Sequence, residues 1–388
     1  MSTSPLPEST HSPLSEFPLS KSVTDYSESF HREGNRISES NVVDSESLPV
    51  SNDSITESVT ESVTESKSTT IKHIVISGGG VYGLSAYGAL KYLNEQGKWN
   101  IENIQTIYGT SVGAIVSVIL ALKYEWSIVD DYFIKRPWNN VFQFKLFSIV
   151  QSFETRGIFN ITHLEEIFKP LFGGKDVPIN ITMKEFYDLN HLELHFITVD
   201  LNTFVPVDLS YKTHPNWRLM DAVYCSAALP LIFAPFKKVS ESLANGGPDS
   251  SNENEFYLDG GVICAYPLQN CIDNGANLDE ILGISKECRN NVDSIVSLTD
   301  DSSLIDYILL AFNKLIHKRN KPQRIKIQNE IRIVSEVTSL QSIYLFTNSI
   351  EERNRLIDAG VAAAKNWFME QESLTDLERP VASAEVSD

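Results

Sequence analysis

Apolar residues in the central part of this chain form short runs and helical repeats that alternate with one another. Short runs predict buried strands, and apolar residues spaced three and four apart predict helices. The strands expected are 71–77, 104–108, 192–199, 204–209, 256–259, 280–284 and 331–334. The helices expected are 84–96, 112–122, 217–228, 304–316 and 350–368. This alternation favours an α/β fold with a mostly parallel central sheet. Apolar and polar residues alternate in 192–199, which predicts a half-buried strand with 204–209 as its hairpin partner.

Two short motifs predict further helix starts. Thr162 with Glu165, and Thr182 with Glu185, each match the capping box. In that motif the first side chain accepts a hydrogen bond from the backbone of the third following residue, and the acidic side chain bonds back to the first backbone N–H.

Aromatic residues gather directly after the helix expected at 112–122. Core packing explains most of them, and an apolar cover over a lipid-sized groove is the alternative. The residues concerned are Trp126, Tyr132, Phe133, Trp138, Phe142, Phe144, Phe147 and Phe153.

Composition divides the 388 residues into one globular part and two polar ends. Residues 1–70 are rich in serine, threonine and glutamate and carry a short tandem repeat at 56–66. Such a segment cannot bury enough apolar surface to offset its ordering entropy, so we expect it to be disordered. Residues 371–388 are expected to be an acidic, flexible tail. We expect a single domain over 71–370.

The net charge of −19 lies largely at the two ends. Residues 1–70 hold 12 acidic and 4 basic residues (−8), 371–388 hold 5 and 1 (−4), and 71–370 keep 34 and 27 (−7). A mildly acidic core argues against nucleic-acid binding and gives no general attraction to anionic membranes. Any peripheral contact with a membrane is therefore expected to be apolar and local.

Sequence signals for export or for crossing a membrane are lacking. The start of the chain has neither a basic n-region nor an apolar h-region. The longest uncharged stretch, 104–122, is interrupted by glycines and hydroxyl residues and is expected to be core. We expect an intracellular protein, cytoplasmic or peripherally associated with a membrane.

The cysteines indicate neither a disulfide framework nor a zinc site, because no pair has C-x-x-C spacing. Buried free thiols are expected. The four cysteines are Cys225, Cys264, Cys271 and Cys288.

A G-x-S-x-G sequence carries the strongest chemical signal. Ser111 lies between Gly109 and Gly113, after an expected strand and before an expected helix. Such an elbow holds a serine hydroxyl on a strained turn and aims the amides of the next helix at developing negative charge. The two glycines stand where a side chain would collide with a neighbouring strand or helix.

Residues 78–83 fit the pattern G-x-G-x-x-G between the first expected strand and helix. A dinucleotide pyrophosphate can bind at such a helix N-terminus. That site needs an acidic residue near the end of the second strand, where this chain runs into the serine elbow instead. The same amides can stabilise an oxyanion, and the nearby elbow favours this use.

A serine nucleophile also needs a base. Asp259 ends a short apolar strand, and Gly260 and Gly261 after it allow close backbone approach. Its alternative role is to cap a turn. The histidines are each expected to be structural or solvated, because none lies in a sharp turn that would present a catalytic imidazole. They are His11, His31, His73, His163, His191, His195, His214 and His317.

The motifs at 78–83, 109–113 and 259–261, in this order, resemble the patatin-like phospholipase family, whose members use a Ser-Asp dyad. Segments 198–201 and 222–230 also look like patatin segments, and the similarity extends over about 71–370. The resemblance implies a three-layer α/β/α sandwich and a lipid acyl hydrolase, of the phospholipase A or acyl-ester hydrolase type. No metal or organic cofactor is implied.

The resemblance also implies a role for each motif. Ser111 is the expected nucleophile, and Asp259 is the base that takes its proton. The oxyanion hole is expected in the glycine turn, with the amides of Gly79 and Gly80 as donors. The turn residues assigned to it are Gly78, Gly79, Gly80 and Gly83.

Two positions depart from the family pattern. Tyr82 stands where the family commonly has Arg or Lys, and Ala265 where it commonly has Asn. We expect Tyr82 to orient the substrate, and because tyrosine carries no formal charge at neutral pH, we expect a weak preference for anionic head groups.

Two alternatives to a dyad hydrolase remain. In the first, His317 follows Asp259 in the chain order of a Ser-Asp-His esterase. In the second, the protein binds lipid with weak or no chemistry. The sequence gives no indication of oligomeric state.

Overall fold

The structure is a computed structural model that describes residues 69–143, 154–238, 255–288, 304–319, 325–335 and 339–377. Contacts divide the chain into 1–65 and 66–388, and the fold described here belongs to the second unit. The disorder expected for 1–70 falls almost entirely outside the described residues.

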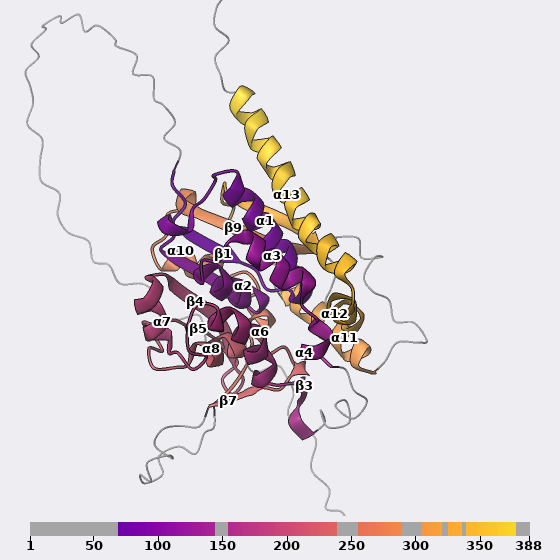
Figure 1. Cartoon of the computed structure of the whole chain (residues 1–388). Helices are drawn as coiled ribbons and strands as arrows, with labels where there is room; N and C mark the ends of the chain where they lie inside the picture. The colour runs from indigo at the N-terminus through magenta and orange to yellow at the C-terminus, as the bar shows by residue number, and fades with distance from the viewer. Residues whose placement is uncertain are drawn as a thin grey trace, which may run out of the picture. The chain divides into compact units, whose positions relative to one another are not determined.

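A sheet of eight strands forms the centre of the fold (Figure 1). The strands lie in the order β10-β9-β1-β2-β4-β8-β7, with β5 paired to β4 outside this path. Strands β10, β9, β1, β2 and β4 are parallel, whereas β5, β7 and β8 pair antiparallel. Their bounds are β1 His73–Ile76, β2 Thr106–Thr110, β4 Glu193–Asp200, β5 Val205–Leu209, β7 Phe236–Lys238, β8 Glu255–Asp259, β9 Ile281–Cys288 and β10 Glu330–Ser335. A small separate sheet pairs β3 (Gly157–Phe159) with β6 (Leu231–Phe233).

Helices alternate with these strands along the chain. They are α1 Gly83–Glu95, α2 Val112–Ala121, α3 Trp126–Lys135, α4 Trp138–Val141, α6 Ile161–Gly173, α7 Met183–Asn190, α8 Leu219–Ala227, α10 Leu268–Asp273, α11 Leu304–Arg319, α12 Leu340–Asn348 and α13 Ile350–Leu377. Short 3-10 turns are η1 Gly80–Tyr82, η2 Ile101–Asn103, η3 Gly260–Val262 and η4 Leu278–Glu280. Among the described helices, none combines the length and the hydropathy that crossing a bilayer requires.

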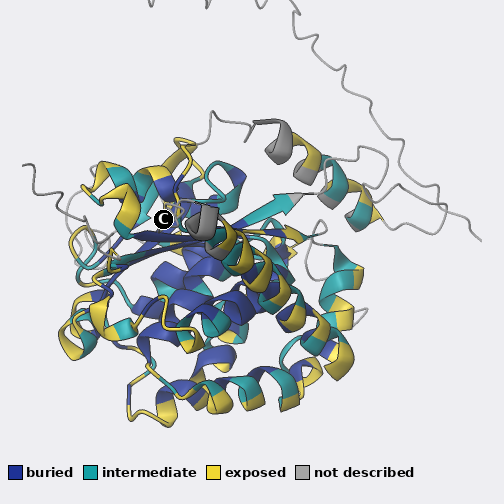
Figure 2. Ribbon diagram, turned by 90° about the horizontal axis from the view of Figure 1, so that it is seen from above, coloured by how far each residue is buried: buried dark blue, intermediate teal, exposed yellow. Residues whose placement is uncertain are grey.

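The two faces of the sheet are covered unequally. On one face, α1, α2, α8 and α13 enclose the main apolar core, and Figure 2 shows the buried residues concentrated in the sheet and in the helices beside it. On the other face, α10 brings Leu268 and Cys271 against Val75 and Tyr108. Successive residues of β1 and β2 point to opposite faces, so each strand contributes to both layers. The expected α/β/α sandwich with a mostly parallel sheet is confirmed.

Helices α1 and α13 approach each other backbone to backbone. A Cβ atom on Gly88 would lie 2.3 Å from the carbonyl oxygen of Ile357, and one on Gly360 would lie 1.8 Å from that of Ser85. The hydroxyl of Ser85 donates a 2.7 Å hydrogen bond to the carbonyl of Leu356. Helix α13 runs beyond the expected end at 368 and continues into the segment expected to be a flexible tail.

Strand β4 differs from the half-buried strand that the alternating pattern predicts. It is buried along nearly its whole length, because β2 flanks it as a parallel partner and β5 as an antiparallel one. Its polar residues are buried because they bond to one another or to the backbone. Glu193 and His195 are 3.0 Å apart, and Thr198 donates to two carbonyl groups.

The prediction of a capping box at Thr162 and Glu165 is wrong. The side chain of Asn160 caps α6 instead, accepting from the N–H of Thr162 at 3.2 Å, while the ring of His163 bonds back to the Asn160 N–H. An asparagine caps as well as a threonine, so the earlier residue takes the position. The second capping box, at 182–185, is confirmed.

The described aromatic residues after α2 pack into the main core, as the packing interpretation predicts. The rings of Tyr132 and Trp138 lie 5.4 Å apart, and Phe142 lies 5.2 Å from Phe159. Phe144, Phe147 and Phe153 lie outside the described residues.

Candidate active site

Ser111 occupies the sharp turn between β2 and α2. Its backbone has φ 57° and ψ −123°, a conformation that L-residues rarely adopt and that costs on the order of 1–3 kcal/mol. The flanking glycines make the turn sterically feasible. A Cβ on Gly109 would lie 2.6 Å from the Gly113 carbonyl oxygen, and one on Gly113 would lie 2.4 Å from that of Ile76. The strain at Ser111 is thus held in place by close backbone contacts on both sides.

Asp259 lies beside this serine although 148 positions separate them in sequence. The hydroxyl of Ser111 donates to Oδ2 of Asp259 at 2.5 Å. The other carboxylate oxygen, Oδ1, accepts from the N–H of Gly261 at 2.7 Å. Asp259 is 3% exposed and Ser111 9%. The aspartate therefore caps the η3 turn and also orients the serine hydroxyl.

Strand β4 determines this meeting through its register. Thr110, the last residue of β2, pairs with Ile197, and Asp259, the last residue of β8, pairs with the next residue of β4, Thr198. Strands β2 and β8 both pair with β4, and this register places Ser111 and Asp259 at the same level of the sheet.

Ser226 fixes the backbone of the elbow. Its hydroxyl accepts from the N–H of Ser111 at 3.0 Å and donates to the carbonyl of Ile197 at 2.6 Å. Sequence analysis did not assign Ser226 a role. Its place within 222–230, a segment similar to patatins, was the available signal.

Burial sets the protonation behaviour of the aspartate. Desolvation raises the pKa of Asp259 to about 6, although its hydrogen bonds with Ser111 and Gly261 act in the opposite direction. A carboxylate with this pKa is ionised at neutral pH and is also close to the range in which proton transfer is efficient.

The glycine turn lies directly against the elbow, but its members differ in what their amides can do. A Cβ on Gly78 would lie 3.1 Å from Cβ of Ser111. The N–H of Gly78 already donates to the carbonyl of Ala265 at 2.8 Å. Gly83 caps η1 with its N–H, and a Cβ there would lie 2.2 Å from a methyl carbon of Val112. Gly78 and Gly83 therefore shape the turn, and the expected donors remain the amides of Gly79 and Gly80.

Gly79 and Gly80 have the backbone geometry of an open turn. Their φ angles are 155° and 60°, values that favour glycine. Within the described part of the chain, the N–H of Gly80 has no acceptor.

Tyr82 is buried in the main apolar core. It is 0% exposed and belongs to the main apolar core, because η1 leads straight into α1 and turns this position inward. This burial does not favour a substrate-orienting role for Tyr82, which stays a prediction.

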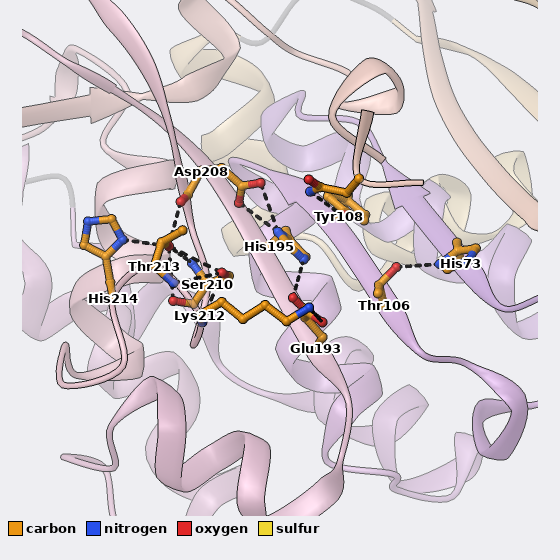
Figure 3. Close-up of polar contacts among 11 residues, drawn as sticks. His73, Thr106, Tyr108, Glu193, His195, Asp208, Ser210, Lys212, Thr213 and His214 are labelled. Carbon is orange, nitrogen blue, oxygen red and sulfur yellow. Dashed lines mark hydrogen bonds and ion pairs between the residues drawn. The ribbon is translucent and has the colours of Figure 1, made fainter. Parts of the chain in front are cut away.

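The described histidine side chains contact residues other than Ser111 and Asp259. His195 lies between Asp208 and Glu193, at 3.0 Å from each, and stacks on Tyr108 with 4.1 Å between ring centroids (Figure 3). His73 bonds to the hydroxyl of Thr106 at 2.8 Å. His317 belongs to α11, but its side chain lies outside the described residues.

A serine elbow on a mostly parallel sheet with helices on both faces defines an α/β protein with hydrolase-like architecture. A family model described as patatin-like phospholipase matches residues 74–272, about half of the chain. The chain belongs to the patatin-like phospholipase family.

Similar proteins occur in viruses and in yeast. The uncharacterised protein R571 of Acanthamoeba polyphaga mimivirus is 24% identical over 305 residues, which cover 77% of this chain and 94% of that protein. A probable lipid hydrolase, 463L, of Invertebrate iridescent virus 6 is 28% identical, over 51% of this chain and 62% of its own length. The triacylglycerol lipase ptl3 of Schizosaccharomyces pombe is 31% identical, but only 41% of this chain and 33% of the lipase are covered.

Solved structures with a related chain trace include VipD from Legionella pneumophila. It has 15% sequence identity and a TM-score of 0.42, with 78% of this chain and 67% of VipD covered. Human GIVD cytosolic phospholipase A2 has 11% identity and a TM-score of 0.40, with 79% and 60% covered.

Proposed function

We propose that this protein is a lipid acyl hydrolase in which Ser111 and Asp259 form a catalytic dyad. The observation that carries the proposal is the 2.5 Å hydrogen bond from the buried serine hydroxyl to the aspartate carboxylate. Membership of the patatin-like phospholipase family supports a lipid ester as the substrate. The names of the viral and yeast relatives point in the same direction.

The reaction takes place in two halves. Ser111 Oγ attacks the ester carbonyl carbon while its proton passes to Oδ2 of Asp259, which gives a tetrahedral oxyanion. The intermediate collapses to an acyl-enzyme, and the departing alcohol takes the proton from Asp259. A water molecule then gives its proton to Asp259 and attacks the acyl carbon. Collapse releases the fatty acid, and the proton returns to Ser111.

The oxyanion donors in this proposal are the amides of Gly79 and Gly80. The closeness of the glycine turn to Ser111 supports the assignment, as does the N–H of Gly80, which lacks an acceptor within the described residues. Loss of one such donor typically costs about 2.7–4 kcal/mol at the transition state.

Substitution of the nucleophile tests the proposal. Ser111→Ala should lower hydrolysis of a short-chain acylglycerol by several orders of magnitude while the circular dichroism spectrum is retained. Ser117→Ala is the matched control, because Ser117 is a buried serine of α2 whose hydroxyl bonds to the Gly113 carbonyl. Hydrolysis by Ser111→Ala at the parent rate would show that another nucleophile acts. Lipid binding with no hydrolysis by the parent protein would favour the non-catalytic alternative.

A further inference from the structure

Lys286 lies against the glycine turn although it is far from that turn in the sequence. It belongs to β9, which runs parallel to β1 with Ile284 paired to Ile76. Lys286 is therefore two residues beyond the last residue of β1 in register, at the level of the glycines. A Cβ on Gly79 would lie 2.7 Å from Cδ of Lys286 and 3.3 Å from its Nζ.

We propose that Lys286 binds the phosphate of an anionic phospholipid while the ester of that lipid lies at Ser111. The inference rests on the proposed acyl hydrolase function and adds a substrate class to it. In a glycerophospholipid only a short glycerol linker separates the ester from the phosphate. An ammonium group beside the turn that receives the ester oxygen is thus placed within reach of the head group.

The chemistry of lysine suits this role. Its ammonium is a compact charge with three donors that binds phosphate as a point charge. Lys286 is half-buried, and both its apolar stem and its ammonium lie against Gly79. Because Gly79 has no side chain, nothing at that position separates the ammonium from the backbone of the turn.

The surrounding charge makes the effect local. Residues 71–370 carry 34 acidic and 27 basic residues, so the domain as a whole repels anions. A charge pair at the partly dehydrated edge of the sheet is stronger than one in bulk water. Selectivity for phosphate at this site therefore depends on a nearby cation rather than on the general field of the protein.

This cation replaces the one that position 82 lacks. The weak preference for anionic head groups expected from Tyr82 assumed that this residue faces the substrate. Tyr82 is buried, and the positive charge beside the turn comes from β9 instead.

A charge-specific kinetic comparison tests the proposal. Short-chain phosphatidic acid and the matching diacylglycerol, both kept below their aggregation limits, are hydrolysed by the parent protein, Lys286→Gln, Lys286→Arg and Lys135→Gln. Lys135 is an exposed lysine of α3 that pairs with Asp131 one helical turn away, so its substitution removes the same charge at a remote place. The ratio of kcat/KM for the phosphate lipid to that for the neutral lipid should fall about tenfold in Lys286→Gln. It should be largely kept in Lys286→Arg and unchanged in Lys135→Gln.

An equilibrium measurement separates this inference from the hydrolase proposal. An ether-linked short-chain phosphatidic acid, which cannot be hydrolysed, should bind Ser111→Ala about tenfold more tightly than it binds Ser111→Ala combined with Lys286→Gln. Equal affinities, or an unchanged kinetic ratio, overturn the role of Lys286 and leave the dyad untouched. An equal loss on both esters in Lys286→Gln also overturns it, because lysine would then act on the fold or on catalysis in general. If the parent hydrolyses neither ester, the dyad proposal fails, and the binding measurement alone decides the role of Lys286.

Discussion

The hydroxyl of Ser226 and the backbone N–H of Ser111 are joined by a 3.0 Å hydrogen bond, and both groups are buried. Through this bond the N–H of Ser111 has an acceptor on a side chain. Ser226 in turn is anchored to Ile197 of β4. The elbow is thus tied to the same strand that places Asp259.

Removal of this hydroxyl should weaken both the fold and the site. We expect Ser226→Ala to lower the free energy of unfolding by about 1–3 kcal/mol, because it leaves a buried N–H without an acceptor. Activity should fall as well, since the position of Ser111 is less well defined. Urea denaturation and acylglycerol hydrolysis measure the two effects. A variant with unchanged stability would show that water or another group replaces the hydroxyl.

Substitution of the aspartate should be as damaging as substitution of the serine. Asp259→Asn keeps the shape of the side chain but removes the proton acceptor, so we expect a loss of several orders of magnitude in kcat, similar to that of Ser111→Ala. His317→Ala should retain nearly the parent rate. If folded His317→Ala is inactive, the catalytic unit is a Ser-Asp-His triad instead.

The hydrolysis rate should depend on pH through Asp259. Burial raises the pKa of this carboxyl to about 6, and only its ionised form accepts the proton of Ser111. The value of kcat/KM should therefore be steady above about pH 7 and fall about tenfold per pH unit well below 6. A profile that remains flat down to pH 4.5 would contradict the assignment of Asp259 as the base.

The raised pKa of Asp259 also predicts that ionisation of this carboxyl lowers the stability of the fold, although it is needed for activity. A pKa above its ordinary value of 3.8 means that ionisation of Asp259 disfavours the folded state as the pH rises from about 4 through about 6. Asp259→Asn should accordingly raise the melting temperature at pH 8 relative to the parent protein, and less so at pH 4. A lower melting temperature at both pH values would show that the carboxylate is needed for packing.

His195 should contribute to a different pH dependence of stability. Burial lowers the pKa of its ring, but hydrogen bonds and charge from Asp208 and Glu193 outweigh this and raise it above the ordinary 6.5. Lys212 also faces the cluster through a 2.8 Å ion pair with Glu193. With a raised folded-state pKa, the stabilisation is fully present below pH 6.5 and is lost as the pH rises through the folded-state pKa.

The difference between two melting curves isolates this contribution from the other histidines. We expect the parent protein to exceed His195→Asn in melting temperature most at pH 5.5 to 6, and the gap to narrow toward pH 9. A gap that does not change with pH would mean that the ring acts only through packing and its stack on Tyr108.

Tyr82→Arg should now destabilise the protein rather than change its preference among head groups. Arginine would place a charge in the buried main core, which costs several kcal/mol when no partner is present. Tyr82→Phe, which keeps the ring, is the control. Comparison of melting temperatures, and of rates on a charged and an uncharged ester, checks this. An arginine variant that folds normally and prefers phospholipids would support a substrate-orienting role for position 82.

Features that depend on neighbours in sequence could be predicted from the residues alone. Gly109 is required by its contacts with Gly113 and Ala114, and Gly261 by its contact with Asp259, all within a few residues in sequence. The parallel sheet follows from the alternation of apolar strands and helices. For the same reason the capping box at 182–185 was recognisable.

Features that depend on strand register or on the direction of a turn could not be predicted. Ser226 and Lys286 meet the elbow and the glycine turn only because β4 and β9 are aligned with β2 and β1. Tyr82 is buried because it belongs to the short η1 turn, and the sequence has no periodicity from which its burial could be predicted. The burial of β4 escaped prediction because its polar residues are satisfied by groups on other elements.

The close backbone contact between α1 and α13 has a consequence for the minimal folding unit. The family match ends at 272, yet β9 covers one edge of β1 and α13 covers the face of α1 around Gly88. A fragment cut at the end of the match would keep Ser111 and Asp259 but expose an unpaired strand edge and a bare helix face, the features that drive chains to associate. The part of the chain that the family model matches is therefore shorter than the part we expect to fold by itself. We expect the segment after 272 to be as necessary for folding as the motifs before it.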